Sequence, residues 1–138
     1  MAHRVFVYGT LKRGFPNHAL MHNATFFGEA RTVLTYPMVV HGSGFSVVIM
    51  PEPGTGHRIL GEVWEVDDAQ LAELDKLEST HLPTGYIREP IDVALEPSGS
   101  VETVFVYFKP RDRVGVIHAG PHADYQDRRW VPFAQRMG

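Results

Sequence analysis

The stretch Val5-Phe6-Val7-Tyr8-Gly9 decides how the chain begins to fold. Its first four residues are all apolar or aromatic and include β-branched valines, a pattern typical of a strand buried on both faces. Gly9 ends this run, and Gly14 and Pro16 follow closely, which predicts a loop over residues 10–17. We therefore expect a buried strand that leads directly into a loop.

Further runs of β-branched and aromatic residues alternate with glycine and proline along the rest of the chain. They predict strands over residues 26–33, 38–40, 47–50, 60–66, 86–95 and 101–108. Asn17 is a candidate cap for a short helix that extends to residue 21, and Pro90 marks an edge or a bulge in its strand. From Arg111 onward the sequence has no clear period, so we expect mostly loop there.

The main helix is predicted over residues 69–78. Asp67 and Asp68 are candidate caps, Gln70 stands at capping-box spacing from Asp67, and leucines recur at helical intervals at Leu71, Leu74 and Leu77. Six or seven strands with this helix and one short helix indicate an α+β fold. So many strands in so short a chain favour a small mixed sheet that curls like a β-barrel.

Composition limits the classes of function. The chain has 138 residues, 43% of them hydrophobic and 21% charged, which suits a single domain over residues 1–138 with its own core. A net charge of -3 argues against nucleic acid or anionic membrane as a partner and favours a small-molecule site.

The absence of cysteine excludes disulfides and thiolate chemistry. No segment resembles a signal peptide or a membrane span, so we expect a cytoplasmic protein. Nothing in the sequence specifies an oligomeric state.

Glu78 is the candidate general base. It follows Leu71 by one heptad, so on a continuous helix its side chain points within about 20° of that leucine, toward the apolar interior. A carboxylate in such a position loses water, which disfavours its charged form and raises its pKa toward neutral pH. The alternative is that the helix ends earlier and Glu78 is an exposed charge at its C-terminus.

The segment from Tyr8 to Gly14 is the candidate binding element. A glycine directly after a buried strand allows the backbone to approach a ligand and present successive N–H groups to a carboxylate. The alternative is an ordinary turn at the end of a strand, with Lys12 and Arg13 as solvated surface charges.

These segments resemble a known family. Val5-Phe6-Val7-Tyr8-Gly9-Thr10-Leu11-Lys12-Arg13-Gly14, followed by Pro16-Asn17-His18, is similar to the N-terminal signature of the γ-glutamylcyclotransferase-like superfamily, and most closely of its γ-glutamylamine cyclotransferase branch, the AIG2-like family. Leu74-Asp75-Lys76-Leu77-Glu78 resembles the end of that family's catalytic helix, although Leu77 stands where an aromatic residue is common. The resemblance also includes 86–88 and 105–107, and so extends to about Phe108.

The resemblance implies both a reaction and a set of site residues. A small mixed barrel would catalyse an intramolecular acyl transfer at one mouth, with no metal or organic cofactor. The backbone of Tyr8, Gly9, Thr10 and Leu11 would hold the α-amino and α-carboxylate end of a γ-glutamyl substrate, and Glu78 would accept the proton. The products would be 5-oxoproline and a free amine, for example lysine from γ-glutamyl-ε-lysine.

Alternatives remain open at this stage. The substrate could instead be a γ-glutamyl-α-amino acid or another γ-glutamyl conjugate, or the chain could bind γ-glutamyl compounds or 5-oxoproline without turning them over. Tyr107 and Tyr125 are candidate pocket-lining residues, although Tyr107 lies in a predicted strand where a packing role is equally expected. His18 and His22 have a spacing that can bind metal, but no third ligand is evident near them, so we expect no metal.

Overall fold

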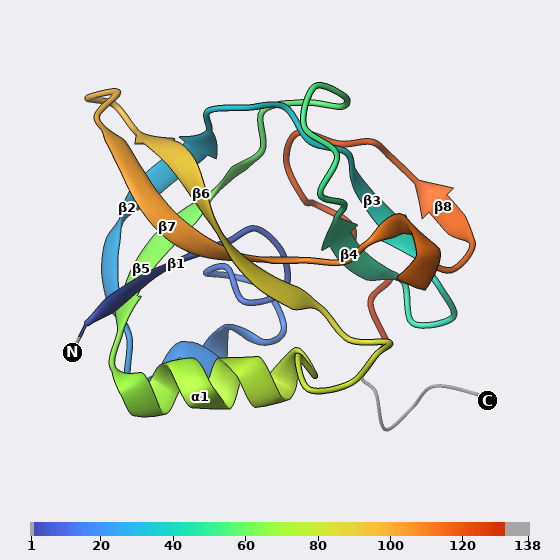
Figure 1. The fold of residues 1–138 in the computed structure, drawn as a ribbon, viewed down its shortest axis with the longest axis horizontal. Helices are drawn as coiled ribbons and strands as arrows, with labels where there is room; N and C mark the ends of the chain where they lie inside the picture. Colours follow the sequence, from blue (N-terminus) through green and yellow to red (C-terminus); the bar gives the residue numbers. More distant parts are fainter. Residues whose placement is uncertain (1, 132–138) are drawn as a thin grey trace.

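A closed barrel forms the centre of the molecule, which we describe for residues 2–131 of a computed structural model. Its strands follow the spatial order β1-β5-β2-β6-β7, and β7 pairs in parallel with β1 at Val5 and Phe105 to close the circle (Figure 1). The other neighbours in the barrel are antiparallel. The barrel strands are β1 (His3–Val7), β2 (Thr25–Thr32), β5 (Leu60–Val66), β6 (Ile87–Leu95) and β7 (Val101–Phe108).

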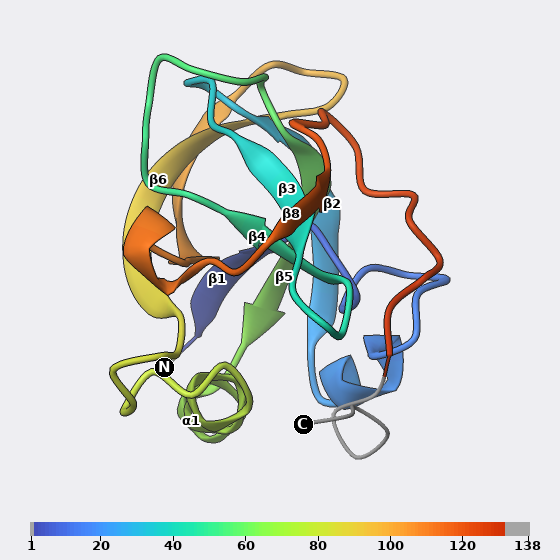
Figure 2. The ribbon, with the colours of Figure 1, turned by 90° about the vertical axis from the view of Figure 1, so that its right-hand side faces the viewer.

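A second, smaller sheet lies beside the barrel. It has the order β4-β3-β8 and consists of β3 (Met38–His41), β4 (Ser46–Ile49) and β8 (Ile117–Ala119). Figure 2 shows this sheet in front of the barrel. One face of the β3–β4 hairpin joins the barrel core through Met38, Val40, Val47 and Ile49. The hairpin therefore closes one side of the barrel and provides part of a wall there.

Strand β1 is buried on both faces, as its sequence predicted. Phe6 and Tyr8 point into the barrel core, whereas Val5 and Val7 belong to a second apolar cluster outside it. Successive side chains of a strand point to opposite faces, so an uninterrupted apolar run is what two buried faces require. The first strand therefore contacts both cores of the molecule.

Helix α1 (Asp68–Leu77) covers the outer face of the barrel at β1 and β5. Its N-cap is Asp67, whose side chain accepts a 2.7 Å hydrogen bond from the Gln70 N–H. Leu71 and Leu74 are buried in the cluster that contains Val5 and Val7. The helical spacing of the leucines thus fixes which side of α1 faces the barrel.

The structure confirms the α+β class and the barrel, with small differences from the predicted elements. Eight strands lie within residues 2–131, rather than six or seven, and α1 ends at Leu77 rather than Glu78. The expectation of mostly loop after Arg111 was wrong in part, because η2 (Arg111–Arg113) and β8 form there. Strand β8 is only three residues long and exists through its pairing with β3, so it leaves no periodic signal in the sequence.

The structure also tests the predicted short helix after Asn17 and the predicted edge position of Pro90. A short 3₁₀ helix, η1 (His18–Met21), follows Asn17, whose side chain makes no capping bond. Pro90 lies on a stretch of β6 that pairs with β7, whereas β2 contacts β6 only through residues 93–95, so the proline has an edge position. Among the described residues, no helix is long and apolar enough to cross a membrane.

Leu74 provides a test of this packing, because its side chain is 1% exposed between α1 and the barrel. Replacing it with alanine should lower the free energy of unfolding by about 3 kcal/mol, since the change removes buried apolar surface and leaves a cavity. Leu77→Ala is the control: Leu77 is 45% exposed, and its replacement should cost less than about 1 kcal/mol. Urea unfolding measures both, and equal losses would contradict the assigned helix face.

Candidate active site

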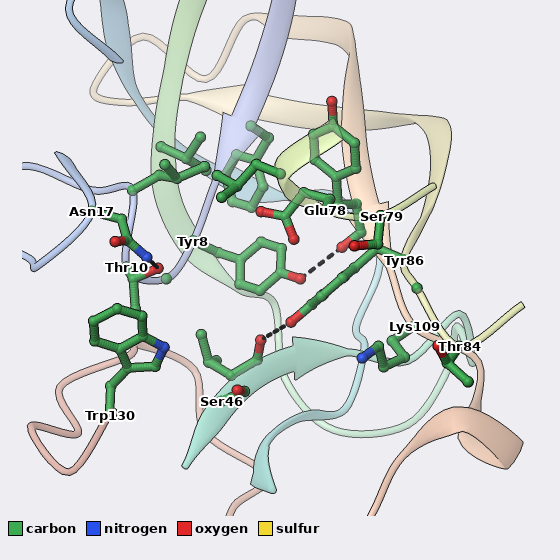
Figure 3. A pocket seen from close by; sticks show the side chains of 18 of the residues that line it. Tyr8, Thr10, Asn17, Ser46, Glu78, Ser79, Thr84, Tyr86, Lys109 and Trp130 are labelled. Atoms are coloured by element: carbon green, nitrogen blue, oxygen red, sulfur yellow. Dashed lines mark hydrogen bonds between the residues drawn. The ribbon is translucent and has the colours of Figure 1, made fainter. Parts of the chain in front are cut away.

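A cavity of about 670 Å³ opens where the loop after β1, the end of α1 and strand β4 meet (Figure 3). Its apolar walls are formed by Phe6, Val7, Leu11, Val47, Leu77, Leu82 and Trp130. Its polar side chains are Tyr8, Thr10, Asn17, Ser46, Glu78, Ser79, Thr84, Tyr86, Tyr107 and Lys109. Gly9 and Gly85 complete the lining, so the cavity brings together segments far apart in the sequence.

The end of α1 presents Glu78 to this cavity. Glu78 is the C-cap, and two hydrogen bonds close the helix behind it: Ser79 N–H to the Lys76 carbonyl and Thr80 N–H to the Asp75 carbonyl, both 3.1 Å. This is the Schellman arrangement, which requires a left-handed residue after the C-cap. Ser79 takes that conformation, with φ of 55°, although glycine is the usual choice. The chain then turns sharply, and Glu78 remains at the cavity wall.

Glu78 is half-buried and lines the cavity. Burial raises the pKa of its carboxyl group from 4.5 to about 7, and the positive charge of Lys109 opposes part of that rise. A carboxyl group with such a pKa exchanges protons readily at neutral pH, which suits a general acid or base.

Tyr8 forms the floor beside Glu78. Its hydroxyl donates a 2.6 Å hydrogen bond to the Tyr107 carbonyl and accepts a longer one, 3.4 Å, from the Ile49 N–H. Burial, followed by the negative charge of Glu78, raises the pKa of the Tyr8 phenol far above its ordinary value. Tyr8 is therefore neutral at any physiological pH, and it links the barrel to strand β4.

The turn after β1 exposes backbone donors to the same cavity. Within the described residues, the N–H groups of Gly9, Thr10 and Leu11 have no protein acceptor, although all three residues line the cavity. Asn17 fixes the turn, because its N–H donates to the Thr10 carbonyl at 2.8 Å and its amide donates to the Thr10 hydroxyl at 2.9 Å. The turn is thus held in place while its N–H groups are available to an anionic ligand.

A polar network behind the cavity joins α1 to the barrel. The Tyr107 hydroxyl and the Arg88 guanidinium donate to the two carboxylate oxygens of Asp75, at 2.7 and 2.8 Å. Asp75 lies almost one helical turn before Glu78, and the Tyr107 carbonyl accepts the Tyr8 hydroxyl. The network therefore fixes the relative positions of the acid and the tyrosine floor.

Most of the predicted site residues meet at this cavity, but not all of them. Glu78, Tyr107 and the segment 8–11 line it, whereas Tyr125 does not: Tyr125 is 0% exposed in the barrel core, with its ring centroid 5.2 Å from that of Phe15. Its apolar surroundings explain why it lies inside the core rather than at the pocket mouth.

The charged residues near the turn face away from the cavity. Lys12 is 6% exposed and donates to an Asp124 carboxylate oxygen at 2.9 Å, so it is a buried anchor for the C-terminal segment rather than a solvated charge. Arg13 pairs with Glu62 at 3.1 Å, and a ring nitrogen of His18 lies 2.9 Å from the Leu11 carbonyl oxygen. Within residues 2–131, no three metal-ligating side chains gather together.

Sequence reasoning missed several lining residues. Tyr86 donates a 2.9 Å hydrogen bond to the Val47 carbonyl, and the Lys109 ammonium lies 4.6 Å from the centre of the Tyr86 ring. Trp130 reaches the cavity from the segment after β8. A signal for Lys109 was present, because it follows Tyr107 by two residues and alternate residues of an extended chain share a face.

Gly9 tests how tightly the turn packs on β4. A Cβ at this position would lie 2.3 Å from a methyl carbon of Val47, so Gly9→Ala must displace the cavity wall. We expect a loss of about 2 kcal/mol in the free energy of unfolding. Gly28→Ala is the control, since its Cβ would meet Leu95 at an ordinary 3.8 Å and should cost less than about 1 kcal/mol. Equal Tm values for the two variants would contradict the close approach.

The raised pKa of Glu78 predicts a pH-dependent stability. Between pH 4.5 and about 7 the native state binds more protons than the unfolded state, so the contribution of Glu78 to stability falls as the pH rises through this range. Glu78→Gln should therefore gain about 2 to 3 kcal/mol relative to wild type between pH 5 and pH 8. Urea unfolding at both pH values measures the gain. Glu73→Gln, on the exposed side of α1, should show no such change, and a similar gain there would contradict the burial of Glu78.

A protein-family model and individual known proteins both match this chain, and their names point to the same family. The family model described as gamma-glutamyl cyclotransferase, AIG2-like, matches residues 5–131. A gamma-glutamylaminecyclotransferase from Bos taurus is 44% identical over 108 residues, which cover 75% of this chain and 63% of that protein. The Mus musculus protein of the same name is 40% identical over 119 residues, covering 78% of this chain and 77% of its own length.

Solved structures show the same likeness over a greater length. The crystal structure of an AIG2-like protein from Mus musculus superimposes with a TM-score of 0.82 at 32% identity, and the match covers 98% of this chain and 99% of that one. The likeness therefore includes the segment after Phe108, which the sequence motifs alone did not align.

Proposed function

The chain belongs to the gamma-glutamyl cyclotransferase, AIG2-like family, and we propose that it cyclises γ-glutamyl amines to 5-oxoproline and releases the free amine. The observation that carries this proposal is the position of Glu78, with its raised pKa, at the same cavity as the backbone donors of Gly9, Thr10 and Leu11. The relatives named gamma-glutamylaminecyclotransferase support the choice of an amine as leaving group.

The γ-glutamyl head of the substrate binds at the turn after β1. Its α-carboxylate accepts hydrogen bonds from the available N–H groups of this turn, which are held by Asn17 and need no rearrangement to bind. The α-amino group then lies toward Glu78. The neutral Tyr8 ring supports the chain from below, so that the amine and the γ-carbonyl of one molecule come together.

Ring closure follows from this placement. The Glu78 carboxylate takes one proton from the neutral α-amine as its nitrogen attacks the γ-carbonyl carbon and forms the new C–N bond. When the tetrahedral intermediate collapses, the bond from that carbon to the leaving nitrogen breaks, and Glu78 returns its proton to the departing amine. The products are 5-oxoproline and a free amine, and Glu78 is again a carboxylate.

The pKa of Glu78 predicts the pH dependence of this reaction. The base must be ionised, so kcat/KM should fall as the pH is lowered through about 7 and Glu78 takes up a proton. Glu78→Gln cannot accept a proton and should lose at least about 100-fold in kcat. Glu73→Gln, a carboxylate change on the exposed face of the same helix, should retain wild-type activity.

The assay follows 5-oxoproline released from γ-glutamyl-ε-lysine by purified protein. Equal release by wild type and Glu78→Gln would exclude Glu78 as the base. If wild type releases no 5-oxoproline from this substrate, the proposed activity is wrong. If it also releases none from a panel of γ-glutamyl-α-amino acids, although γ-glutamyl-ε-lysine raises its Tm, the chain is a binding module.

A further inference from the structure

We propose that Lys109 forms a leaving-group subsite that recognises a carboxylate on the departing amine, so that among γ-glutamyl amines the enzyme prefers those whose amine carries a carboxylate, such as the ε-amine of lysine. This inference rests on the proposed function, because it takes the γ-glutamyl head to bind at the turn after β1. It concerns the opposite side of the cavity, to which neither the sequence motifs nor the family name assigns a role.

The cavity has two sides, with Tyr8 and Glu78 between them. Figure 3 shows Thr10, Asn17 and Trp130 on one side and Lys109 and Thr84 on the other. If the head of the substrate is held at Thr10 and its amine faces Glu78, the leaving group extends toward Lys109. A substituent on that leaving group then lies near the ammonium rather than near the turn.

Lys109 is held in position by its neighbours. Its backbone N–H donates to the Ile49 carbonyl at 3.0 Å, and its ammonium lies 4.6 Å from the centre of the Tyr86 ring. Tyr86 is itself fixed, because its hydroxyl donates to the Val47 carbonyl and its N–H donates to the Glu78 carbonyl. The cation is therefore placed on an aromatic surface that belongs to the cavity wall.

The charges around the cavity are unevenly distributed. Among the described residues that line it, Glu78 carries the acid and Lys109 the cation, and the two occupy different parts of the wall. Arg113 adds positive charge on the side of Lys109, since its guanidinium donates to the carbonyl of the lining residue Gly85 at 3.1 Å. This side of the cavity attracts an anionic substituent and repels a cationic one.

A matched pair of substrates isolates the effect. γ-Glutamyl-ε-lysine and γ-glutamylcadaverine have the same reacting amide and the same terminal ammonium, and differ only in the α-carboxylate of the lysine. Wild type should show a kcat/KM for the lysine conjugate at least about tenfold higher. Lys109→Met should reduce that ratio to about one, mainly by lowering the value for the lysine conjugate, whereas Lys109→Arg should retain the preference.

The measurement is best made at pH 8.5. Lys109 lowers the pKa of Glu78, so its removal should raise that pKa further. A pH of 8.5 lies well above the wild-type pKa of about 7 and therefore limits the effect of this rise on the ionisation of the base. Changes in the substrate ratio then report the subsite rather than the ionisation of the base. A kcat/KM profile against pH for Lys109→Met, displaced to higher pH, checks this separation.

Three outcomes would overturn the proposal. Wild type could process both substrates equally well, or Lys109→Met could keep the wild-type ratio; either result removes the subsite. An equal fall for both substrates would place the ammonium at the γ-glutamyl head instead. These results differ from failure of the proposed function, in which wild type releases 5-oxoproline from neither substrate.

Discussion

The way in which α1 ends is the constraint on which the site depends. Its last carbonyl groups are satisfied by a pair of backbone hydrogen bonds that require a left-handed residue at Ser79, a conformation that costs a non-glycine residue about 1 kcal/mol. The Asp75 network and the bond from Tyr86 N–H to the Glu78 carbonyl hold the chain there. A strained residue directly beside a desolvated carboxyl group is the kind of arrangement that function rather than stability maintains.

The sequence predicted the elements that have strong local signals. The apolar run at the first strand and the leucine spacing of α1 correspond to buried faces in the structure, and the family resemblance is confirmed. The predicted direction of the Glu78 side chain assumed that the helix continues through this residue, whereas Glu78 is the C-cap of α1. Its φ of −83° is still close to helical, so the side chain keeps the direction that the heptad spacing predicted.

Other parts of the site depend on contacts that no local pattern encodes. Trp130 reaches the cavity only because the C-terminal segment returns across the loop after β1, where Lys12 binds Asp124. Strand β8 forms only against the edge of β3. The aromatic ring and hydroxyl of Tyr125 suit a pocket residue, but the position of this residue depends on how the C-terminal segment packs against Phe15. Such features follow from tertiary structure, and a single sequence gives little information about them.

The barrel closes by a parallel contact between its first and last strands, and this has a consequence for the protein during its synthesis. The cavity wall runs from Phe6 to Trp130, so a nascent chain that has emerged from the ribosome only as far as α1 carries the carboxylate and the turn but not the wall that encloses them. Glu78 is then surrounded by water and has an ordinary acidity. Its pKa rises only late, when the last strands have been synthesised and the barrel closes around it.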